Sequence, residues 1–352
     1  MVTVNIPELV KEASAMTTKM VKGYEVLSHI DEIDVGTAPK ELVYQDGRVK
    51  LYHYRNPKKP SNQTPVLIAY ALINKQYMLD LEPDRSLVRN LLSEGVDLYI
   101  IDWGYVTRGD RYDSVEDYVN GYLDGCVEFI RRSTEKKQIN LAGVCQGGTL
   151  CTMYAALYPE KIKNLITIVT PIDFSTNDGL LFRWSRYMDI DTIVDSYGTI
   201  PGDFLNAGFA LLKPMQKIDK YLHLLDVIDN HDKTMNFLRM EYWILDSPDQ
   251  AGECYRQFLI DLYKHNKLVK GTFKVGNQTV DLKKVTMPLL NIYAKQDHIV
   301  PPAASKPLNQ LVGSKDTKLY EFEGGHIGVF VSSKTQKELA PAISNWLHER
   351  DK

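Results

Sequence analysis

Hydrophobic and polar residues change their spacing several times along the chain, and each spacing predicts a different kind of element. Between residues 6 and 30, apolar side chains recur at every third or fourth position, which predicts an amphipathic helix. Residues 41–55 contain two β-rich runs on either side of Asp46-Gly47, a strong signal for a hairpin. The chain is therefore expected to begin with a helix and an antiparallel pair of strands.

From residue 65 onward, short apolar runs rich in Val and Ile alternate with helical segments. Amphipathic stretches such as 86–95 and 114–133 separate the runs. Strands that are apolar on both faces are typical of a parallel sheet covered by helices on both sides. The sequence therefore predicts an α/β fold with a mostly parallel central sheet. The apolar runs lie at 65–72, 96–103, 139–143, 165–171 and, after a long interruption, 287–297.

The interruption between residues 174 and 286 has a mostly helical pattern and is rich in Trp and Tyr. Because it separates two consecutive strands, we expect it to form a cap over the carboxyl edge of the sheet, where α/β folds bind ligands. We therefore divide the chain into four parts. These are an N-terminal helical segment (1–36), the first part of the core (37–173), the cap (174–286) and the second part of the core (287–352).

Composition and charge narrow the classes of function. The net charge is -3, with basic residues scattered among acidic ones, so no surface for nucleic acid is indicated. The N-terminus lacks a signal-peptide pattern, and the longest apolar run, 65–73, is too short to span a bilayer. The four cysteines have neither C-x-x-C nor metal-finger spacing, so we expect reduced thiols and no metal site. We predict a cytoplasmic protein without a transmembrane segment.

The most informative motif is Gly143-Val144-Cys145-Gln146-Gly147, which lies between a predicted strand and a predicted helix. This G-x-C-x-G pattern is a nucleophile elbow with cysteine in the place usually held by serine. Glycines are needed on both sides because the central residue is strained and a Cβ there would collide with the neighbouring strand and helix. A helix N-terminus also stabilises a thiolate. Cys145 is therefore the candidate nucleophile.

A nucleophile of this kind requires a base and a residue that orients the base. In elbow-containing folds an acid and then a histidine follow the nucleophile along the chain. Asp297 ends an apolar strand, and His326 follows another β-type run, so both are expected at carboxyl ends of strands near Cys145. His298, beside Asp297, is a possible supporting residue, although a structural role fits it equally well.

Two backbone N–H groups are expected to form the oxyanion hole. One belongs to Gln146, directly after the nucleophile. The other is expected in the loop after the first parallel strand, within residues 71–73, and we assign it to Leu72.

Other interpretations of these residues are weaker. A dinucleotide site is disfavoured because GVCQGG lacks the G-x-G-x-x-G spacing and no acidic residue ends a strand about twenty residues later. Cys145 could be an ordinary buried residue, but the elbow glycines and the order of acid and histidine argue against this. Cys151 lies about 240° around the helix from Cys145 and is assigned to the core. The cap aromatics are assigned to packing: Trp184, Tyr242, Trp243 and Tyr255.

Cysteine in place of serine changes the expected chemistry. Transfer of an acyl group from a thioester to a thiol yields another thioester, so the acyl group stays activated and can pass to an alcohol. This suits a transferase that makes esters while excluding water. A hydrolase gains less from a thiol.

With these motifs in place, the chain resembles the catalytic subunit of class III polyhydroxyalkanoate synthases, which belong to the α/β-hydrolase superfamily. The resemblance extends from about residue 37 to the C-terminus and is least clear in the first 36 residues. The stretches that carry it are PVLIAYALINKQYMLDLEPDRS, VDLYIIDWGY, NLAGVCQGGT, VTPIDF, FLRMEYWILDSPDQAGECYRQF, LLNIYAKQDHIVPP and EGGHIGVFVSSK.

The resemblance implies polymerisation of (R)-3-hydroxyacyl-CoA, chiefly 3-hydroxybutyryl-CoA, into polyhydroxyalkanoate with release of CoA. CoA is then part of the substrate, and no separate cofactor is needed. Cys145 would be the acylated nucleophile and His326 its base, while Asp297 would either orient His326 or activate the 3-hydroxyl group. The resemblance further implies a non-catalytic second subunit, a homodimeric or hetero-oligomeric form, and residence at polymer granules.

Two alternatives stay open at this point. One is a cysteine hydrolase of the dienelactone hydrolase or thioesterase type, with the same three residues but with water as the acyl acceptor. The other is a catalytically silent relative that scaffolds granule or partner assembly, against which the presence of Cys145, Asp297 and His326 argues.

Overall fold

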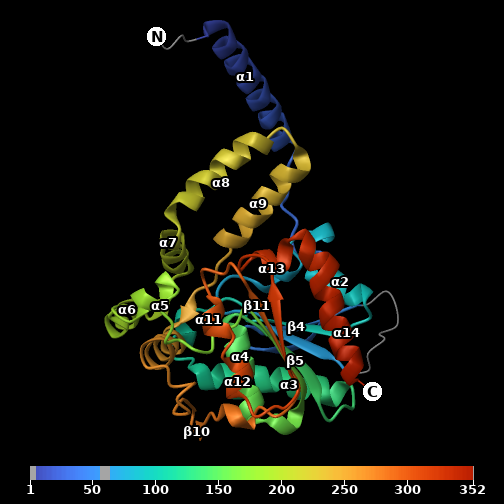
Figure 1. Cartoon of the computed structure of the whole chain (residues 1–352), viewed down its shortest axis with the longest axis vertical. Coiled ribbons are helices and arrows are strands. Elements are labelled where there is room, and N and C mark those ends of the chain that lie inside the picture. The colour runs from blue at the N-terminus through green and yellow to red at the C-terminus, as the bar shows by residue number, and fades with distance from the viewer. Residues whose placement is uncertain (1–4, 56–63, 352) are drawn as a thin grey trace.

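The centre of the molecule is an eight-stranded sheet (Figure 1). The structure, a computed structural model, describes residues 5–55 and 64–351, so the first four residues of the predicted N-terminal segment lie outside the described part. The strand order is β1-β2-β4-β3-β5-β6-β11-β12, and β1, β2 and β4 are antiparallel neighbours while all later pairs are parallel. The predicted α/β fold is confirmed. The strands are β1 (Lys40–Asp46), β2 (Val49–Tyr54), β3 (Val66–Ala69), β4 (Leu98–Asp102), β5 (Ile139–Val144), β6 (Ile162–Ile168), β11 (Leu289–Ala294) and β12 (Thr317–Phe322).

The predicted hairpin is formed by β1 and β2, with its turn one residue later than the Asp46-Gly47 signal suggests. Asp46 pairs with Val49, so the two loop residues are Gly47 and Arg48. Gly47 has φ +55°, a conformation that glycine adopts without steric cost. The antiparallel start of the sheet is thus confirmed.

The two faces of the sheet contribute to separate hydrophobic cores because successive side chains of a strand point to opposite faces. In β5, for example, Leu141 belongs to the core beneath α3 and α4, whereas Ala142 belongs to the core beneath α2 and α14. This explains why the strands are apolar throughout. The helices nearest the sheet are α2 (Leu87–Ser93), π-helix η4 (Asp117–Leu123), α3 (Asp124–Ser133), α4 (Gln146–Leu157), α11 (Pro302–Ser305), α12 (Leu308–Leu311), α13 (Gly328–Val331), π-helix η8 (Thr335–Leu339) and α14 (Ala340–Arg350).

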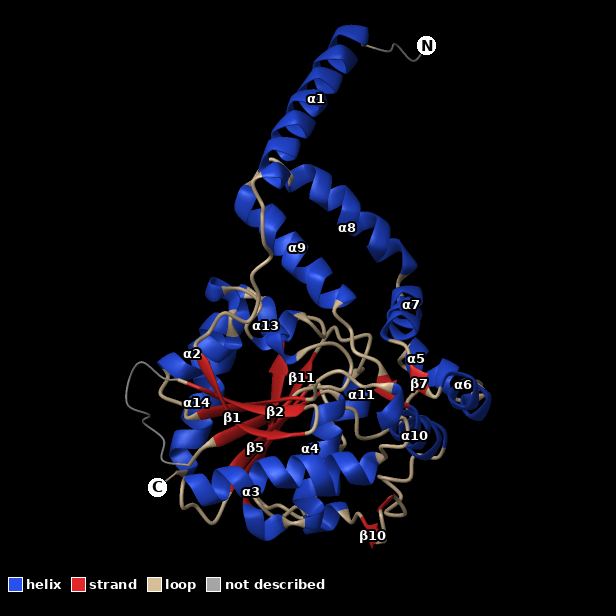
Figure 2. Ribbon diagram, turned by 180° about the vertical axis from the view of Figure 1, so that it is seen from behind, coloured by secondary structure: helices blue, strands red, loops and turns tan. Residues whose placement is uncertain are grey.

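The segment between β6 and β11 is mainly helical, and two views show its helices beyond one end of the sheet (Figure 1, Figure 2). The proposed domain boundaries at residues 36, 173 and 286 stay predictions. The elements of this segment are α5 (Leu180–Ser185), α6 (Ile190–Tyr197), β7 (Thr199–Ile200), α7 (Gly202–Leu212), α8 (Pro214–Val227), α9 (His231–Leu245), β8 (Gln250–Ala251), α10 (Gly252–Gln257), π-helix η6 (Phe258–Lys264), β9 (Lys274–Val275), β10 (Gln278–Thr279) and the short η7 (Leu282–Lys284). The remaining short 3-10 turns are η1 (Gln76–Leu79), η2 (Pro83–Arg85), η3 (Arg108–Asp110) and η5 (Pro159–Lys161).

The end of α9 is anchored to loops at the carboxyl edge of the sheet. The indole N–H of Trp243 donates to the carbonyl of Lys75 at 2.8 Å. The hydroxyl groups of Tyr77 and Tyr105 donate to the carboxylate of Asp246 at 2.7 and 2.5 Å. These bonds fix the position at which the helical segment meets the core.

The N-terminal helix α1 (Ile6–Ser28) agrees with the predicted amphipathic helix and projects away from the sheet (Figure 2). It meets the rest of the chain near its C-terminal end, where Gly23 packs against Ile228 and the Lys19 ammonium group donates to the carbonyl of Asp226 at 2.6 Å. Among the described residues, no helix has the length and apolar character needed to cross a lipid bilayer.

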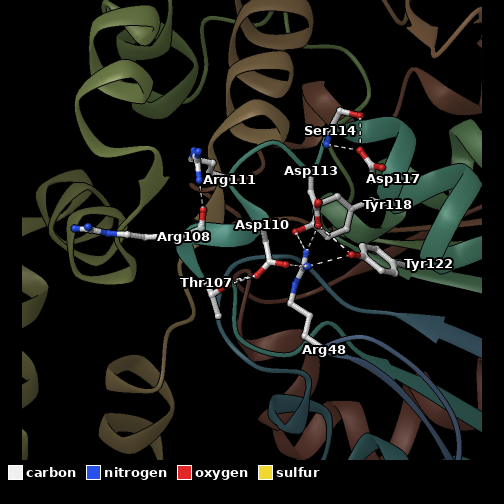
Figure 3. Close-up of polar contacts among 10 residues, drawn as sticks. All are labelled: Arg48, Thr107, Arg108, Asp110, Arg111, Asp113, Ser114, Asp117, Tyr118 and Tyr122. Atoms are coloured by element: carbon white, nitrogen blue, oxygen red, sulfur yellow. Dashed lines mark hydrogen bonds and ion pairs between the residues drawn. The ribbon is translucent and has the colours of Figure 1, made fainter.

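A partly buried arginine, Arg48, ties the hairpin to the loop that follows β4 (Figure 3). The Arg48 guanidinium lies 2.9 Å from the Asp110 carboxylate and 2.8 Å from that of Asp113, and it donates to the hydroxyl groups of Tyr118 and Tyr122. Because Asp113 also accepts a backbone bond from Cys254 of α10 through its carbonyl, this loop connects the hairpin to the helical segment.

Candidate active site

The elbow places Cys145 between the end of β5 and the start of α4, with φ +52° and ψ -122°. The flanking glycines fit the expected steric reason. A Cβ on Gly143 would overlap the backbone of Gly148, and a Cβ on Gly147 would overlap the carbonyl oxygen of Tyr70. The close contact at Gly147 also places the loop after β3 directly against the elbow.

Asp297 and His326 lie three and four residues beyond the ends of β11 and β12, at the same edge of the sheet as Cys145. The Nδ1 atom of His326 lies 2.6 Å from Oδ2 of Asp297. The other carboxylate oxygen of Asp297 accepts backbone N–H bonds from Ile299 and Val300 at 2.9 and 2.8 Å. Both oxygens of Asp297 are thus occupied, and Nε2 of His326 is left for Cys145.

Burial and charge act in opposite directions on His326, which is 8% exposed. Burial by itself lowers the pKa of His326, but the charge and hydrogen bond of Asp297, together with those of Cys145, outweigh it and raise this pKa to about 10. The site therefore favours the imidazolium form of His326 next to the sulfur of Cys145.

The two residues predicted to supply oxyanion donors, Gln146 and Leu72, belong to segments that adjoin Cys145 or its cavity. Gln146 is the first residue of α4, where backbone N–H groups lack an acceptor within the helix. The neighbours of Leu72 in the loop after β3, Ala71 and Ile73, line the same cavity as Cys145. The assignment of these two N–H groups to an oxyanion hole stays a prediction.

His298 lies half-buried beside Asp297. Burial and the positive charges of Lys213 and His326 lower the pKa of His298, although the charge of Asp297 opposes this. His298 is therefore neutral at pH 7, and no hydrogen bond to Asp297 or His326 is observed for its ring. Its supporting role stays a prediction.

A cavity of about 540 Å³ opens at Cys145 and His326 and extends between the sheet edge and helices α7, α8 and α9. Its wall near the sulfur is apolar, with Ile299 and Ile327 from the core and Phe209 from α7. Its lining also contains the charged residues Asp203, Lys213, Lys220 and Glu241, of which Asp203 and Lys213 are exposed. The cavity can therefore hold an acyl group at its inner end and a polar or charged group further out.

Several residues of this cavity were not indicated by sequence motifs. Trp243, assigned to packing, is buried and also lines the cavity. Asn74, with φ +58°, and Lys213 line it as well. A single Asn does not by itself indicate a positive φ or a place in a cavity wall, and no motif surrounds Lys213. The other assigned cysteine behaves as expected, since Cys151 is fully buried in the core.

The fold is that of the α/β-hydrolase class, with cysteine at the elbow after β5, and residues 64–333 match the alpha/beta hydrolase fold family. The fold resembles a monoacylglycerol lipase from Paleococcus ferrophilus, with a TM-score of 0.52 and 15% identity over 85% of this chain and 99% of that one. A thermophilic esterase from Thermogutta terrifontis gives a TM-score of 0.54 and 15% identity over 90% and 100% of the two chains.

The chain belongs to the PhaC family of poly(3-hydroxyalkanoate) polymerases. Residues 9–91 match the N-terminal family of poly-beta-hydroxybutyrate polymerase (PhaC). The chain is 48% identical to poly(3-hydroxyalkanoate) polymerase subunit PhaC of Thiocystis violacea over 97% of both chains, and 48% identical to that of Allochromatium vinosum over 97% of this chain and 98% of the relative. The subunit of Synechocystis sp. is also 48% identical, over 99% and 94%. The protein is thus an acyltransferase that polymerises hydroxyacyl-CoA into polyhydroxyalkanoate.

Proposed function

We propose that polymerisation proceeds through a covalent thioester on Cys145, with His326 as base and Asp297 as the residue that orients His326. The observation that carries this proposal is the hydrogen bond between Asp297 and His326, which lines the same cavity as Cys145. Supporting it, the pKa of His326 is raised to about 10, which favours a thiolate and imidazolium pair.

The proposed reaction has two steps. The sulfur of Cys145 attacks the thioester carbonyl, the oxyanion is held by the N–H groups of Gln146 and Leu72, and the CoA thiolate leaves with the proton of His326. His326 then removes the proton of the 3-hydroxyl group of another hydroxyacyl unit, and the hydroxyl oxygen attacks the carbonyl carbon of the acyl group held on Cys145. An ester bond forms, the bond to the Cys145 sulfur breaks, and the thiol regains the proton from His326.

Of the two roles left open for Asp297, we favour orientation of His326. One of its oxygens contacts His326 and the other accepts two backbone N–H bonds. The Asp297 side chain is also fully buried and does not line the cavity, so direct activation of a substrate hydroxyl by Asp297 would require its surroundings to open.

We further propose (R)-3-hydroxybutyryl-CoA as the chief substrate and residues 174–286 as a cap that keeps water from the acyl-enzyme. The first proposal is supported by the resemblance to class III synthases. The second is supported by the position of α7, α8 and α9, which supply much of the cavity wall.

A non-catalytic second subunit is proposed as a partner, within a homodimeric or hetero-oligomeric enzyme at granules in the cytoplasm. The relatives are named as subunits of the polymerase, which supports a multi-subunit enzyme. The surface proposed to bind this subunit is the row of exposed apolar side chains on α1. Its members include Ile6, Leu9, Val10, Met16 and Met20, all at least 44% exposed.

The proposed mechanism is tested by supplying purified enzyme and partner subunit with (R)-3-hydroxybutyryl-CoA and measuring free CoA and products. We expect CoA release with insoluble polyester. Release of CoA with only free hydroxy acid in solution would instead support a cysteine hydrolase. In the Cys145→Ala variant neither product should form, and full activity of that variant would remove Cys145 from the mechanism.

A further inference from the structure

We infer that Lys213 binds a phosphate group of the CoA moiety and thereby positions the pantetheine arm of the substrate in the cavity. Lys213 lies at the junction of α7 and α8 and lines the cavity that begins at Cys145. This inference rests on the proposed placement of the reacting carbonyl at Cys145.

The charged side chains that line the cavity do not all pair with one another. The described lining contains two lysines, Lys213 and Lys220, and two carboxylates, Asp203 and Glu241. Lys220 forms an ion pair with Glu241, which leaves Lys213 and Asp203. These two residues lie at opposite ends of α7, about 15 Å apart at the rise of an α-helix, so they do not neutralise each other.

The surroundings of the Lys213 ammonium group leave it open to a ligand in the cavity. Lys213 is exposed to solvent and lines the cavity, and its positive charge contributes to the lowered pKa of His298, the residue next to Asp297. In the part of the chain that the structure describes, no hydrogen bond or ion pair is observed for the Lys213 ammonium group. A cation in this position is available to a ligand.

The substrate carries its negative charges far from its reacting carbonyl. Hydroxyacyl-CoA carries a pyrophosphate and a ribose phosphate at the far end of its pantetheine arm, while its thioester end is uncharged. The apolar part of the cavity wall suits the uncharged thioester end of the substrate, and the unpaired ammonium group of Lys213 suits a phosphate. An ammonium group pairs with a phosphate through a charge-assisted hydrogen bond.

The test compares (R)-3-hydroxybutyryl-CoA with the corresponding pantetheine thioester, which lacks the phosphates together with the adenosine. With (R)-3-hydroxybutyryl-CoA, Lys213→Met should raise KM by about tenfold with kcat little changed, the effect of losing one charge-assisted hydrogen bond. With (R)-3-hydroxybutyryl-pantetheine, which has no phosphates, wild type and Lys213→Met should have the same KM. Lys213→Arg should keep most of the affinity for the CoA substrate.

Lys233, an exposed lysine on α9 outside the cavity, provides the matched control. Lys233→Met should behave as wild type with both substrates. An unchanged KM for the CoA substrate in Lys213→Met would overturn the inference, and so would an equal rise of KM with both substrates, since that would place Lys213 at the acyl end or in a structural role.

A binding measurement separates this inference from the proposed mechanism. The dissociation constant of free CoA is measured by calorimetry in the Cys145→Ala background, where no turnover is expected. Adding Lys213→Met should weaken CoA binding about tenfold. If CoA binding is unchanged, the inference about Lys213 fails even when Cys145 is the nucleophile. If Cys145→Ala retains activity, the mechanism fails whatever Lys213 does.

Discussion

Cys145 has a backbone conformation that costs a residue other than glycine roughly 1–3 kcal/mol. Such strain persists only where neighbouring structure enforces it, and here the strand β5, the helix α4 and close packing at Gly143 and Gly147 do so. The result is a sulfur at the N-terminus of a helix and beside an imidazole. The elbow therefore holds this sulfur at a fixed position, as the proposed nucleophile requires.

We predict that Cys145→Ser folds normally but loses activity by about two orders of magnitude or more, because a serine hydroxyl is a much weaker acid and forms a less reactive ester intermediate. The measurement is the rate of CoA release per folded enzyme. Cys151→Ala is the control, since Cys151 is buried in the core and should keep its kcat while losing some stability. Equal loss in both variants would contradict a special role for Cys145.

The ion pair between Asp297 and His326 predicts a pH dependence with a definite sign. The pKa of His326 in the folded protein is about 10, above the unperturbed value of about 6.5. Its contribution to stability is therefore fully present below about pH 6.5 and is lost as the pH rises through about 10. In Asp297→Asn, burial acts without the carboxylate, so the pKa of His326 should fall and this contribution should disappear at neutral pH.

Two measurements check this prediction. The stability of wild type against urea should fall between about pH 6.5 and pH 10 by more than that of Asp297→Asn. Alkylation of Cys145 by iodoacetamide near pH 7 should be slower in Asp297→Asn and in His326→Ala than in wild type. Identical alkylation rates in all three proteins would exclude His326 as the activator of the thiol.

At the scale of elements, Arg48 shows how one side chain can hold a hairpin and a loop together. Its side chain is 11% exposed and contacts Asp110 and Asp113, so removal of the guanidinium leaves two carboxylates without their cation. Arg48→Met should lower the free energy of unfolding by about 3 kcal/mol or more. Arg55, on the same hairpin, has a side chain that is 68% exposed and pairs with Glu41, so Arg55→Met should cost less than about 1 kcal/mol.

Urea unfolding of the two variants checks this prediction. A similar small loss for Arg48→Met and Arg55→Met would show that the buried network contributes little, and a change in the slope of the transition would indicate altered unfolding rather than a weaker contact.

The elements differ in how far the sequence predicts them. The parallel strands were predictable because both of their faces are buried, so each is a short run of apolar residues, as in β5 and β11. The Gly47–Arg48 turn differs from the expected position by one residue, because either register of this turn fits the Asp46-Gly47 pattern. The Arg48 network was not predictable, since its partners lie more than sixty residues away and no local pattern connects them.

For the whole molecule, Cys145, Asp297 and His326 could be expected to meet because the order of the parallel strands brings their carboxyl ends to one edge. The wall opposite them could not be predicted in the same way. Trp243 and Lys213 reach the cavity through the packing of α7, α8 and α9 onto the core, and helical patterns alone do not fix such packing. The residues that line this side of the cavity are therefore harder to predict than the three proposed to react.

The projecting helix α1 provides a prediction about assembly. Leu9→Glu with Met16→Glu should abolish co-purification with the second synthase subunit, because both side chains are exposed and a charge would disrupt an apolar contact. The melting temperature should not change, since neither residue packs against the core. Lys11→Glu, another exposed position on α1, is the control and should retain the partner. Normal co-purification of the doubly substituted protein would exclude this face of α1 as the docking surface.

The central claim is that the growing acyl chain is held on the sulfur of Cys145, and the most direct measurement is to identify the acylated residue. The enzyme is mixed with (R)-3-hydroxybutyryl-CoA, quenched in acid, digested, and its peptides are analysed by mass spectrometry. We predict hydroxybutyryl units on the peptide that contains Cys145, joined through a bond that hydroxylamine cleaves, and none in the Cys145→Ala variant. Acylation of another residue during turnover, with Cys145 unmodified, would contradict the account.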